Sequence, residues 1–187
     1  MTESRDLAAN SDLPGVRYGT TPVVVDDRGS FRELWRASLP ELADLRFVQG
    51  NLSTSTAGVL RGLHLHRRQV DHWIVLTGRA FVALVDVRPL IDRRAERPAV
   101  ETRELGAGDW VMIPDGVAHG FLALEPVQLI YRVTNEYDGT DELGFAWDDR
   151  LAAVPWPHVP STADGRPITS ERDRTNPSLA DLVARLR

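Results

Sequence analysis

The stretch GVLRGLHLHRRQVDHWIVLTG, residues 58–78, and the stretch GDWVMIPDGVAHG, residues 108–120, decide the fold. The first follows the pattern Gly58, five residues, His64-Leu65-His66, four residues, Asp71, six residues, Gly78. Because alternate residues of a strand share a face, His64 and His66 are predicted to point the same way. The second runs Gly108, five residues, Pro114, one residue, Gly116, two residues, His119.

Short apolar runs separated by glycine-containing turns continue on both sides of these stretches. They lie at residues 17–25, 31–35, 47–53, 59–65, 72–76, 80–88, 100–105, 110–113, 120–123 and 127–133. Many short strands at this spacing are typical of a β-sandwich or barrel. Near the C-terminus, Ser178 precedes an apolar-periodic segment and is predicted to cap a short helix. We expect residues 1–15 to be a flexible lead and residues 16–187 to form one domain.

Composition narrows the class of protein. The chain has no cysteine, which excludes disulfides and thiolate chemistry and favours a cytoplasmic location. A net charge of −5 argues against nucleic-acid binding. No apolar run approaches the roughly 18 residues of a membrane span, so no membrane association is expected. All 22 basic residues are arginine, which excludes lysine chemistry.

The two spaced patterns resemble the signature motifs of the cupin superfamily. Aspartate stands at Asp71 where the first motif usually has glutamate, and Ala123 replaces the asparagine that usually ends the second. The resemblance implies an all-β fold, a cupin jelly-roll β-barrel with short peripheral helices. It also implies that His64, His66 and His119 line the interior of the barrel.

Further segments are similar to the dTDP-4-dehydrorhamnose 3,5-epimerases, a cupin branch that acts on dTDP-4-keto-6-deoxy-sugars. They are DRGSFRE (27–33), QGNLS (49–53), GVLRGLH (58–64), IPDGVAHGF (113–121), YRVTNEY (131–137), ELGFAW (142–147), VPWP (154–157) and SERD (170–173). The resemblance implies an isomerase that inverts C3, C5 or both through an enolate. His64 would be the base, Tyr131 the acid and Asp173 the carboxylate that orients His64. No cofactor is expected, because the ketone already acidifies the neighbouring C–H bonds.

The same resemblance implies the substrate-binding residues and the oligomeric state. The matching positions are Arg28, Glu33, Gln49, Asn51, Arg61, His66, His119, Tyr137, Glu142 and Arg172. Strict alternation puts Arg61 on the opposite face from His64, so either Gly62 introduces a β-bulge or Arg61 reaches a neighbouring site. A homodimer that exchanges edge strands is expected.

One departure from the epimerases keeps other functions open. Their segment after the catalytic histidine ends in a lysine near the substrate carbonyl, and the aligned position here is Asp71. His66 or His72 could replace that donor. Alternatively, the two histidines could serve a dTDP-sugar 3,4-ketoisomerase, or His64, His66, Asp71 and His119 could bind Fe, Mn, Ni or Zn in a metal-dependent cupin. A non-catalytic module that binds sugar nucleotides is the remaining alternative.

Overall fold

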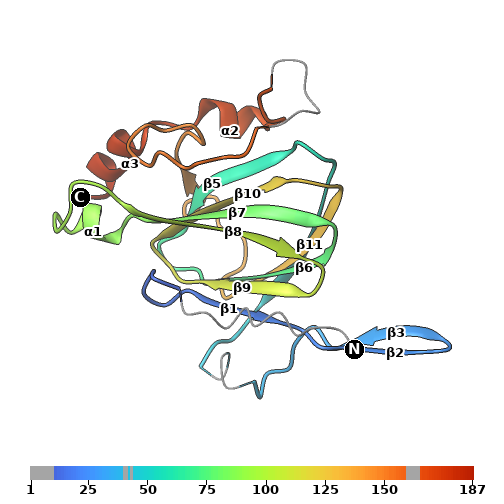
Figure 1. Ribbon diagram of the computed structural model, residues 1–187. Helices are drawn as coiled ribbons and strands as arrows, with labels where there is room; N and C mark the ends of the chain where they lie inside the picture. Colours follow the sequence, from blue (N-terminus) through green and yellow to red (C-terminus); the bar gives the residue numbers. More distant parts are fainter. Residues whose placement is uncertain (1–10, 40–41, 43, 159–164) are drawn as a thin grey trace.

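Two five-stranded antiparallel sheets face each other in the computed structural model, which describes residues 11–39, 42, 44–158 and 165–187 (Figure 1). The first sheet has the order β1 (Arg17–Thr20), β9 (Asp109–Ile113), β6 (Asp71–Thr77), β11 (Val127–Val133) and β4 (Gln49–Ser55). The second has the order β12 (Leu143–Gly144), β5 (Leu60–Leu65), β10 (Val117–Ala123), β7 (Arg79–Asp86) and β8 (Ala99–Gly106). The prediction of an all-β jelly roll is confirmed.

The main hydrophobic core lies between the two sheets. Val75 of β6 and Leu129 of β11 come from the first sheet, and Val82 and Leu84 of β7 come from the second. All four are at most 1% exposed. Their alternation along each strand leaves the intervening side chains on the outer faces of the sheets.

Helices cover the outer face of the second sheet. Leu63, Leu65 and Val85 point outward from this sheet and pack with residues of α1 (Arg88–Ile91) and α3 (Leu179–Leu186). The predicted cap of α3 is confirmed, because the Ser178 side chain accepts a hydrogen bond from the Asp181 N–H. A third short helix, α2 (Glu171–Thr175), was not predicted. Among the described residues, no helix is both long and apolar enough to span a membrane.

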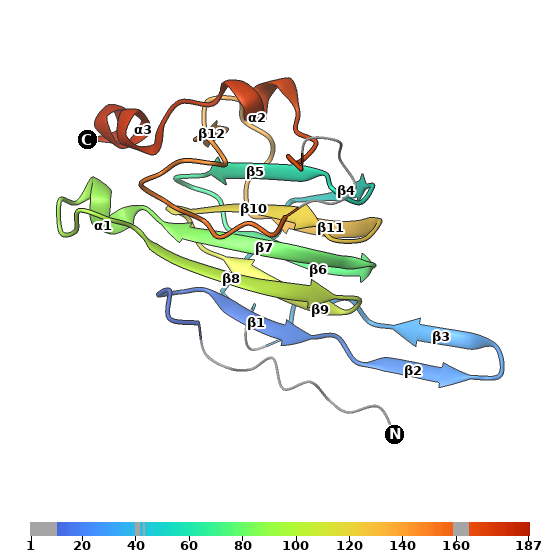
Figure 2. The same ribbon diagram turned by 45° about the horizontal axis from the view of Figure 1, so that its top comes forward.

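A hairpin of β2 (Val23–Asp26) and β3 (Gly29–Arg32) projects beyond the barrel (Figure 2). These two strands pair with each other in a sheet of their own. Val24, Val25 and Phe31 are 63%, 72% and 70% exposed. The hairpin therefore presents apolar side chains that its own barrel does not cover.

The start of the chain is more ordered than expected from Ser11 onward. Leu13 is 2% exposed within the main core, and Ser11 Oγ donates a hydrogen bond of 2.7 Å to Glu101 of β8. The predicted flexible lead therefore does not extend to residues 11–15, because Leu13 adds apolar burial to the barrel. Residues 1–10 lie outside the described part of the chain.

Candidate active site

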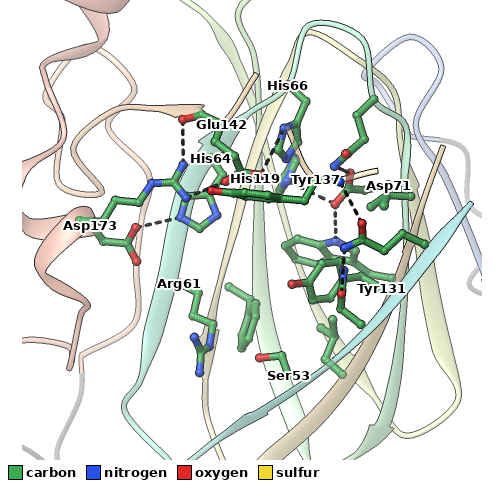
Figure 3. Close-up of a pocket in the computed structure, with 18 of the residues that line it drawn as sticks. Ser53, Arg61, His64, His66, Asp71, His119, Tyr131, Tyr137, Glu142 and Asp173 are labelled. Carbon is green, nitrogen blue, oxygen red and sulfur yellow. Dashed lines mark hydrogen bonds and ion pairs between the residues drawn. The ribbon is translucent and has the colours of Figure 1, made fainter. Parts of the chain in front are cut away.

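A cavity of about 400 Å³ lies between the two sheets, and Figure 3 shows the polar side chains that line it. Its walls come from β4, β6 and β11 on one side and from β5 and β10 on the other. The structure brings together most of the predicted site residues here: Gln49, Asn51, Arg61, His64, His66, His119, Tyr131, Tyr137, Glu142, Arg172 and Asp173.

His64 and Asp173 form a hydrogen-bonded pair on one wall. His64 Nε2 lies 2.8 Å from Asp173 Oδ1, although the two residues are 109 positions apart in sequence. Asp173 sits in α2, where Ser170 caps the helix by accepting from the Asp173 N–H. When Nε2 carries the proton, this N–H donates a hydrogen bond to Asp173, and the lone pair of the imidazole is on Nδ1. The pair can therefore hold one tautomer of His64.

Asp173 is a buried carboxylate whose partners keep it ionised. Burial, the largest single effect, would raise its pKa, but the hydrogen bond and charge of His64 act against it. The Gly62 N–H and the Ser170 side chain act in the same direction, so the pKa of Asp173 is lowered. Asp173 is 3% exposed, while the His64 side chain is 26% exposed. The carboxylate thus stays out of solvent and the imidazole reaches the cavity.

A bulge at Gly62 resolves the conflict between Arg61 and His64. Arg61 pairs with Phe121 and His64 pairs with His119, so three steps along β5 match two steps along β10. Gly62 has a φ of +137°, and a Cβ there would lie 2.6 Å from Gly120 Cα. Glycine permits both this backbone angle and this close approach. Arg61 and His64 therefore both line the cavity.

Tyr131 faces the cavity from the sheet opposite His64. It lies on β11, where its neighbours across the sheet are Asn51 and Trp73. Burial raises the pKa of Tyr131, with smaller contributions from Asp71 and Glu142. The phenol is therefore protonated at neutral pH and can donate a proton.

Charged and aromatic side chains form the rim of the cavity. Arg172 Nη1 donates to Glu142 Oε2 at 2.7 Å, and its Nη2 donates to the Glu142 carbonyl at 3.0 Å. Tyr137 is 71% exposed, and its backbone N–H donates to Gln49 Oε1. The rim thus offers a guanidinium and an exposed ring to an incoming ligand.

Polar and apolar residues that were not predicted as site residues complete the lining. Ser53 Oγ is buried without a hydrogen-bond partner in the described part of the chain. It follows Gln49 and Asn51 at every second position of β4, and this alternation was the signal that could have identified it. The others are Gln69, Asp71, Trp73, Phe121, Leu129, Val133 and Ser170. Of these, Asp71 was predicted to occupy the position of the family's lysine and, in one alternative, to bind a metal.

Asp71, the position at which the resemblance to the epimerases implied a lysine, lies buried in the wall of the cavity. Gln69 Nε2 donates to Asp71 Oδ1 at 2.7 Å, and Trp73 Nε1 donates to Oδ2 at 3.1 Å. His119 Nε2 lies 3.7 Å from Oδ2. Burial lowers the pKa of His119 to about 4, so this imidazole is neutral near neutral pH. Neither residue supplies the positive charge of the absent lysine.

Two predicted substrate-binding residues are not in the cavity. Arg28 lies at the tip of the β2–β3 hairpin and pairs with Asp26, and Glu33 pairs with Arg36 beyond β3. They therefore do not line the cavity of their own chain, and their role in substrate binding stays a prediction. The physical reason is that β2 and β3 pair only with each other, so their side chains leave the barrel.

A jelly-roll barrel with a histidine-lined polar cavity between its sheets has the architecture of the cupin class of proteins. Comparison with known proteins narrows this class. The family model described as dTDP-4-dehydrorhamnose 3,5-epimerase matches residues 10–181. The chain belongs to this family, and it is therefore an isomerase-class enzyme.

Individual relatives agree with this assignment. The chain is similar to a dTDP-4-dehydrorhamnose 3,5-epimerase of Methanothermobacter thermautotrophicus, with 35% identity over 84% of this chain and 86% of the relative. It is similar to an epimerase structure from Mycobacterium tuberculosis, with 30% identity, a TM-score of 0.81, and coverage of 94% and 90% of the two chains. A Legionella pneumophila 3,5-epimerase in complex with dTDP-4-keto-L-rhamnose has 29% identity and a TM-score of 0.81, covering 95% and 94%.

Proposed function

We propose that the chain epimerises a dTDP-4-keto-6-deoxyhexose at C3, at C5, or at both. His64 removes the proton from the carbon next to the C4 carbonyl, which leaves an enolate. Tyr131 then returns a proton from the opposite side, and the carbon is inverted. The observation that carries the proposal is that an Asp-held imidazole and a protonated tyrosine face one cavity from opposite sheets.

The environment of each group suits its role. Asp173 stays ionised and would stabilise the imidazolium that forms when His64 takes a proton. Tyr131 stays protonated because its pKa is raised by burial. An unprotonated base on one side of the sugar and a protonated acid on the other are what two-sided proton transfer requires.

The choice of substrate rests on the relatives and on the charges at the cavity. The structure of the Legionella relative is a complex with dTDP-4-keto-L-rhamnose, and the matching family is described as dTDP-4-dehydrorhamnose 3,5-epimerase. Arg61 and Arg172 line the cavity and suit a diphosphate, because a guanidinium can pair with its oxygens bidentately. Ser53 and Asn51 supply neutral polar groups for sugar hydroxyls.

Deuterium incorporation tests the proposal directly. The protein is incubated with dTDP-4-keto-6-deoxyglucose in D₂O, and NMR follows deuterium at C3 and C5. Label at either carbon with inversion supports the epimerase, and the labelled position distinguishes a 3-epimerase from a 3,5-epimerase. A carbonyl that moves to C3 would instead identify a 3,4-ketoisomerase. Binding of the nucleotide sugar without any exchange would identify a non-catalytic module.

The working form of the enzyme is proposed to be a homodimer. The apolar side chains of the β2–β3 hairpin are exposed to solvent, so burying them against a second copy is favourable. Strand β4 lies at the edge of its sheet, and Leu52 on this strand is 58% exposed. An edge that pairs with a second copy avoids non-specific association. Because β4 also lines the cavity, a partner's hairpin on this edge would bring the partner's Arg28 and Glu33 close to the site.

A further inference from the structure

A buried carboxylate in the wall of the cavity has only neutral partners in the described part of the chain. Asp71 is 3% exposed, and it accepts hydrogen bonds from the Gln69 amide and the Trp73 indole. Glu142, another carboxylate of the cavity, is instead paired with Arg172. Burying a charge without an opposite charge is costly. A cationic group of a bound ligand would therefore be stabilised next to Asp71.

Two imidazoles beside Asp71 present hydrogen-bond acceptors to the cavity. His66 Nδ1 lies 2.9 Å from the Asp141 carbonyl, and His119 Nδ1 lies 3.1 Å from the Val117 carbonyl. Since a carbonyl oxygen only accepts, each Nδ1 carries a proton, and in the neutral ring the lone pair is on Nε2. His119 Nε2 is 3.7 Å from Asp71 Oδ2, too far for a hydrogen bond. We call His66, Asp71 and His119 the acceptor cluster.

An ammonium group matches the composition and spacing of the acceptor cluster. One nitrogen or oxygen atom from each of its three side chains lies within 4.8 Å of the others. An ammonium group has only donors, and acceptors about 2.8 Å from its nitrogen along tetrahedral N–H directions lie about 4.6 Å apart. The pair at 3.7 Å is closer than this, so it would have to open by about an ångström or less.

The acceptor cluster lies next to the proposed base and acid (Figure 3). His119 on β10 is the cross-strand neighbour of His64 on β5, and His66 is two positions after His64. Asp71 on β6 pairs with the residue two positions after Tyr131 on β11. A sugar carbon held between His64 and Tyr131 would therefore have substituents of its ring within reach of the cluster.

We infer that the acceptor cluster binds an ammonium group on C3 of the sugar, so that the preferred substrate is a 3-amino-4-keto-6-deoxy-sugar nucleotide. This inference rests on the proposed epimerase function and specifies its substrate. Of the two carbons next to the C4 carbonyl, C5 already carries the ring oxygen and the methyl carbon, so the amine belongs on C3. With C3 held by the cluster, C5 is the carbon that His64 deprotonates.

The ammonium group would also assist the reaction. It lies one carbon away from the C4 oxygen, where negative charge develops as the enolate forms. A fixed positive charge at that place stabilises the transition state. The chain has no lysine that could supply this charge. The substrate would then bring its own cation, and Asp71 would hold it in place.

Two unreactive ligands test the recognition of the amine apart from catalysis. dTDP-3-amino-3,6-dideoxyglucose and dTDP-6-deoxyglucose differ only in the amine or hydroxyl on C3, and neither has the ketone that the reaction needs. Calorimetry with the full-length protein at pH 7 should give the amino ligand a Kd roughly 10–100-fold lower, as expected for a hydrogen bond to a charged group. Equal affinity for the two ligands would overturn the inference, and this comparison needs no variant.

Asp71→Asn removes the charge and keeps the size of the side chain. It should bring the ratio of the two dissociation constants close to one, whereas a purely structural role of Asp71 would weaken both ligands equally and keep the ratio. Asp115→Asn makes the same chemical change at an exposed position and should retain the wild-type ratio. Far-UV circular dichroism and thermal unfolding check that both variants are folded. A wild-type ratio in folded Asp71→Asn would contradict the assignment.

Deuterium exchange at C5 separates this inference from the proposed function. In D₂O, the dTDP-3-amino-4-keto-3,6-dideoxy sugar should exchange with a kcat/KM at least about 10-fold above that of dTDP-4-keto-6-deoxyglucose. Equal kcat/KM values would overturn the preference for the amine and leave the epimerase proposal standing. Tighter binding of the amino ligand without exchange in either substrate would leave the amine site standing and remove the epimerase.

Discussion

Arg61 and His64 lie on one strand three positions apart, yet both face the same cavity. The extra residue of the β5 bulge is what allows this, and Gly62 provides it. Removing the glycine should therefore disturb the site and the barrel together.

Gly62→Ala is expected to destabilise the fold. The new Cβ would meet Gly120 Cα at 2.6 Å, and the φ of +137° is strained for any side chain. Gly29→Ala is the matched control, because its φ is +125° but nothing lies within 4 Å of a Cβ there. Strain alone costs about 1–3 kcal/mol. Urea unfolding should give a clearly larger loss for Gly62→Ala, and equal losses would show that the close packing against β10 does not matter.

Asp173→Asn should slow catalysis without weakening substrate binding. The new amide can donate to His64 Nε2, which would force the proton onto Nδ1 and leave no base facing the cavity. We expect kcat for deuterium exchange to fall by about 100-fold or more, with KM changed little. Glu171→Gln, an exposed neighbour in α2, should leave both constants as they are. A normal kcat in Asp173→Asn would contradict the orienting role.

Tyr131→Phe should separate proton removal from inversion. Without the phenol, His64 can still abstract and return a proton on its own side. Deuterium should therefore enter at a rate close to that of the wild type while net epimerisation falls by about 100-fold or more. Tyr137→Phe keeps the exposed ring at the rim and should show neither effect. Full inversion by Tyr131→Phe, followed by NMR, would rule out Tyr131 as the acid.

The stability of the protein should fall in mild acid because of His72. Burial, together with the charge of Arg132, lowers the pKa of His72 from 6.5 to about 3. Below pH 6.5 the His72 side chain of the unfolded chain therefore binds a proton, whereas that of the folded chain stays neutral. The free energy of unfolding thus keeps its full value above pH 6.5 and decreases as the pH falls toward 3.

His72→Asn keeps an acceptor for Arg132 and removes that titration. In chemical denaturation between pH 4 and pH 6, its free energy of unfolding should depend on pH less steeply, by up to about 1.4 kcal/mol per unit. His158→Asn replaces an exposed histidine and serves as the control. Parallel curves for wild type and His72→Asn would contradict the neutral, buried assignment.

The proposed dimer should depend on the β2–β3 hairpin. Val24 and Phe31 are paired across the hairpin and are largely exposed. A double change, Val24→Asp with Phe31→Asp, should convert the dimer to a monomer in sedimentation velocity. Arg97→Asp adds an acidic residue at another exposed position and should leave the dimer intact. A dimer that survives the double change would place the interface elsewhere.

Local sequence patterns predicted the barrel well because they reflect local physics. Alternation along 47–53 and 127–133 marks one face of a strand, and the glycines at Gly78 and Gly116 stand at turns with positive φ. The same rule of alternation left the face of Arg61 undecided. Only the register between β5 and β10 could show that a bulge returns it to the cavity.

The site was less predictable, because it depends on contacts between distant parts of the chain. No local pattern links Asp173 to His64, and family resemblance alone suggested the pair. For Arg28 and Glu33 the resemblance implied a role in binding substrate, but matching positions do not reveal which chain's cavity a projecting hairpin serves. Ser53 was overlooked because a serine in a strand carries no signal beyond its alternation with Gln49 and Asn51.

The reach of the β2–β3 hairpin has a consequence for mixtures of damaged chains. If each site combines Arg28 from one subunit with His64 from the other, a chain altered at Arg28 and a chain altered at His64 fail in different places. Co-expressed as a mixed pair, they would rebuild one intact site from two inactive parents. Recovered activity would show that each active site is built from residues of both subunits.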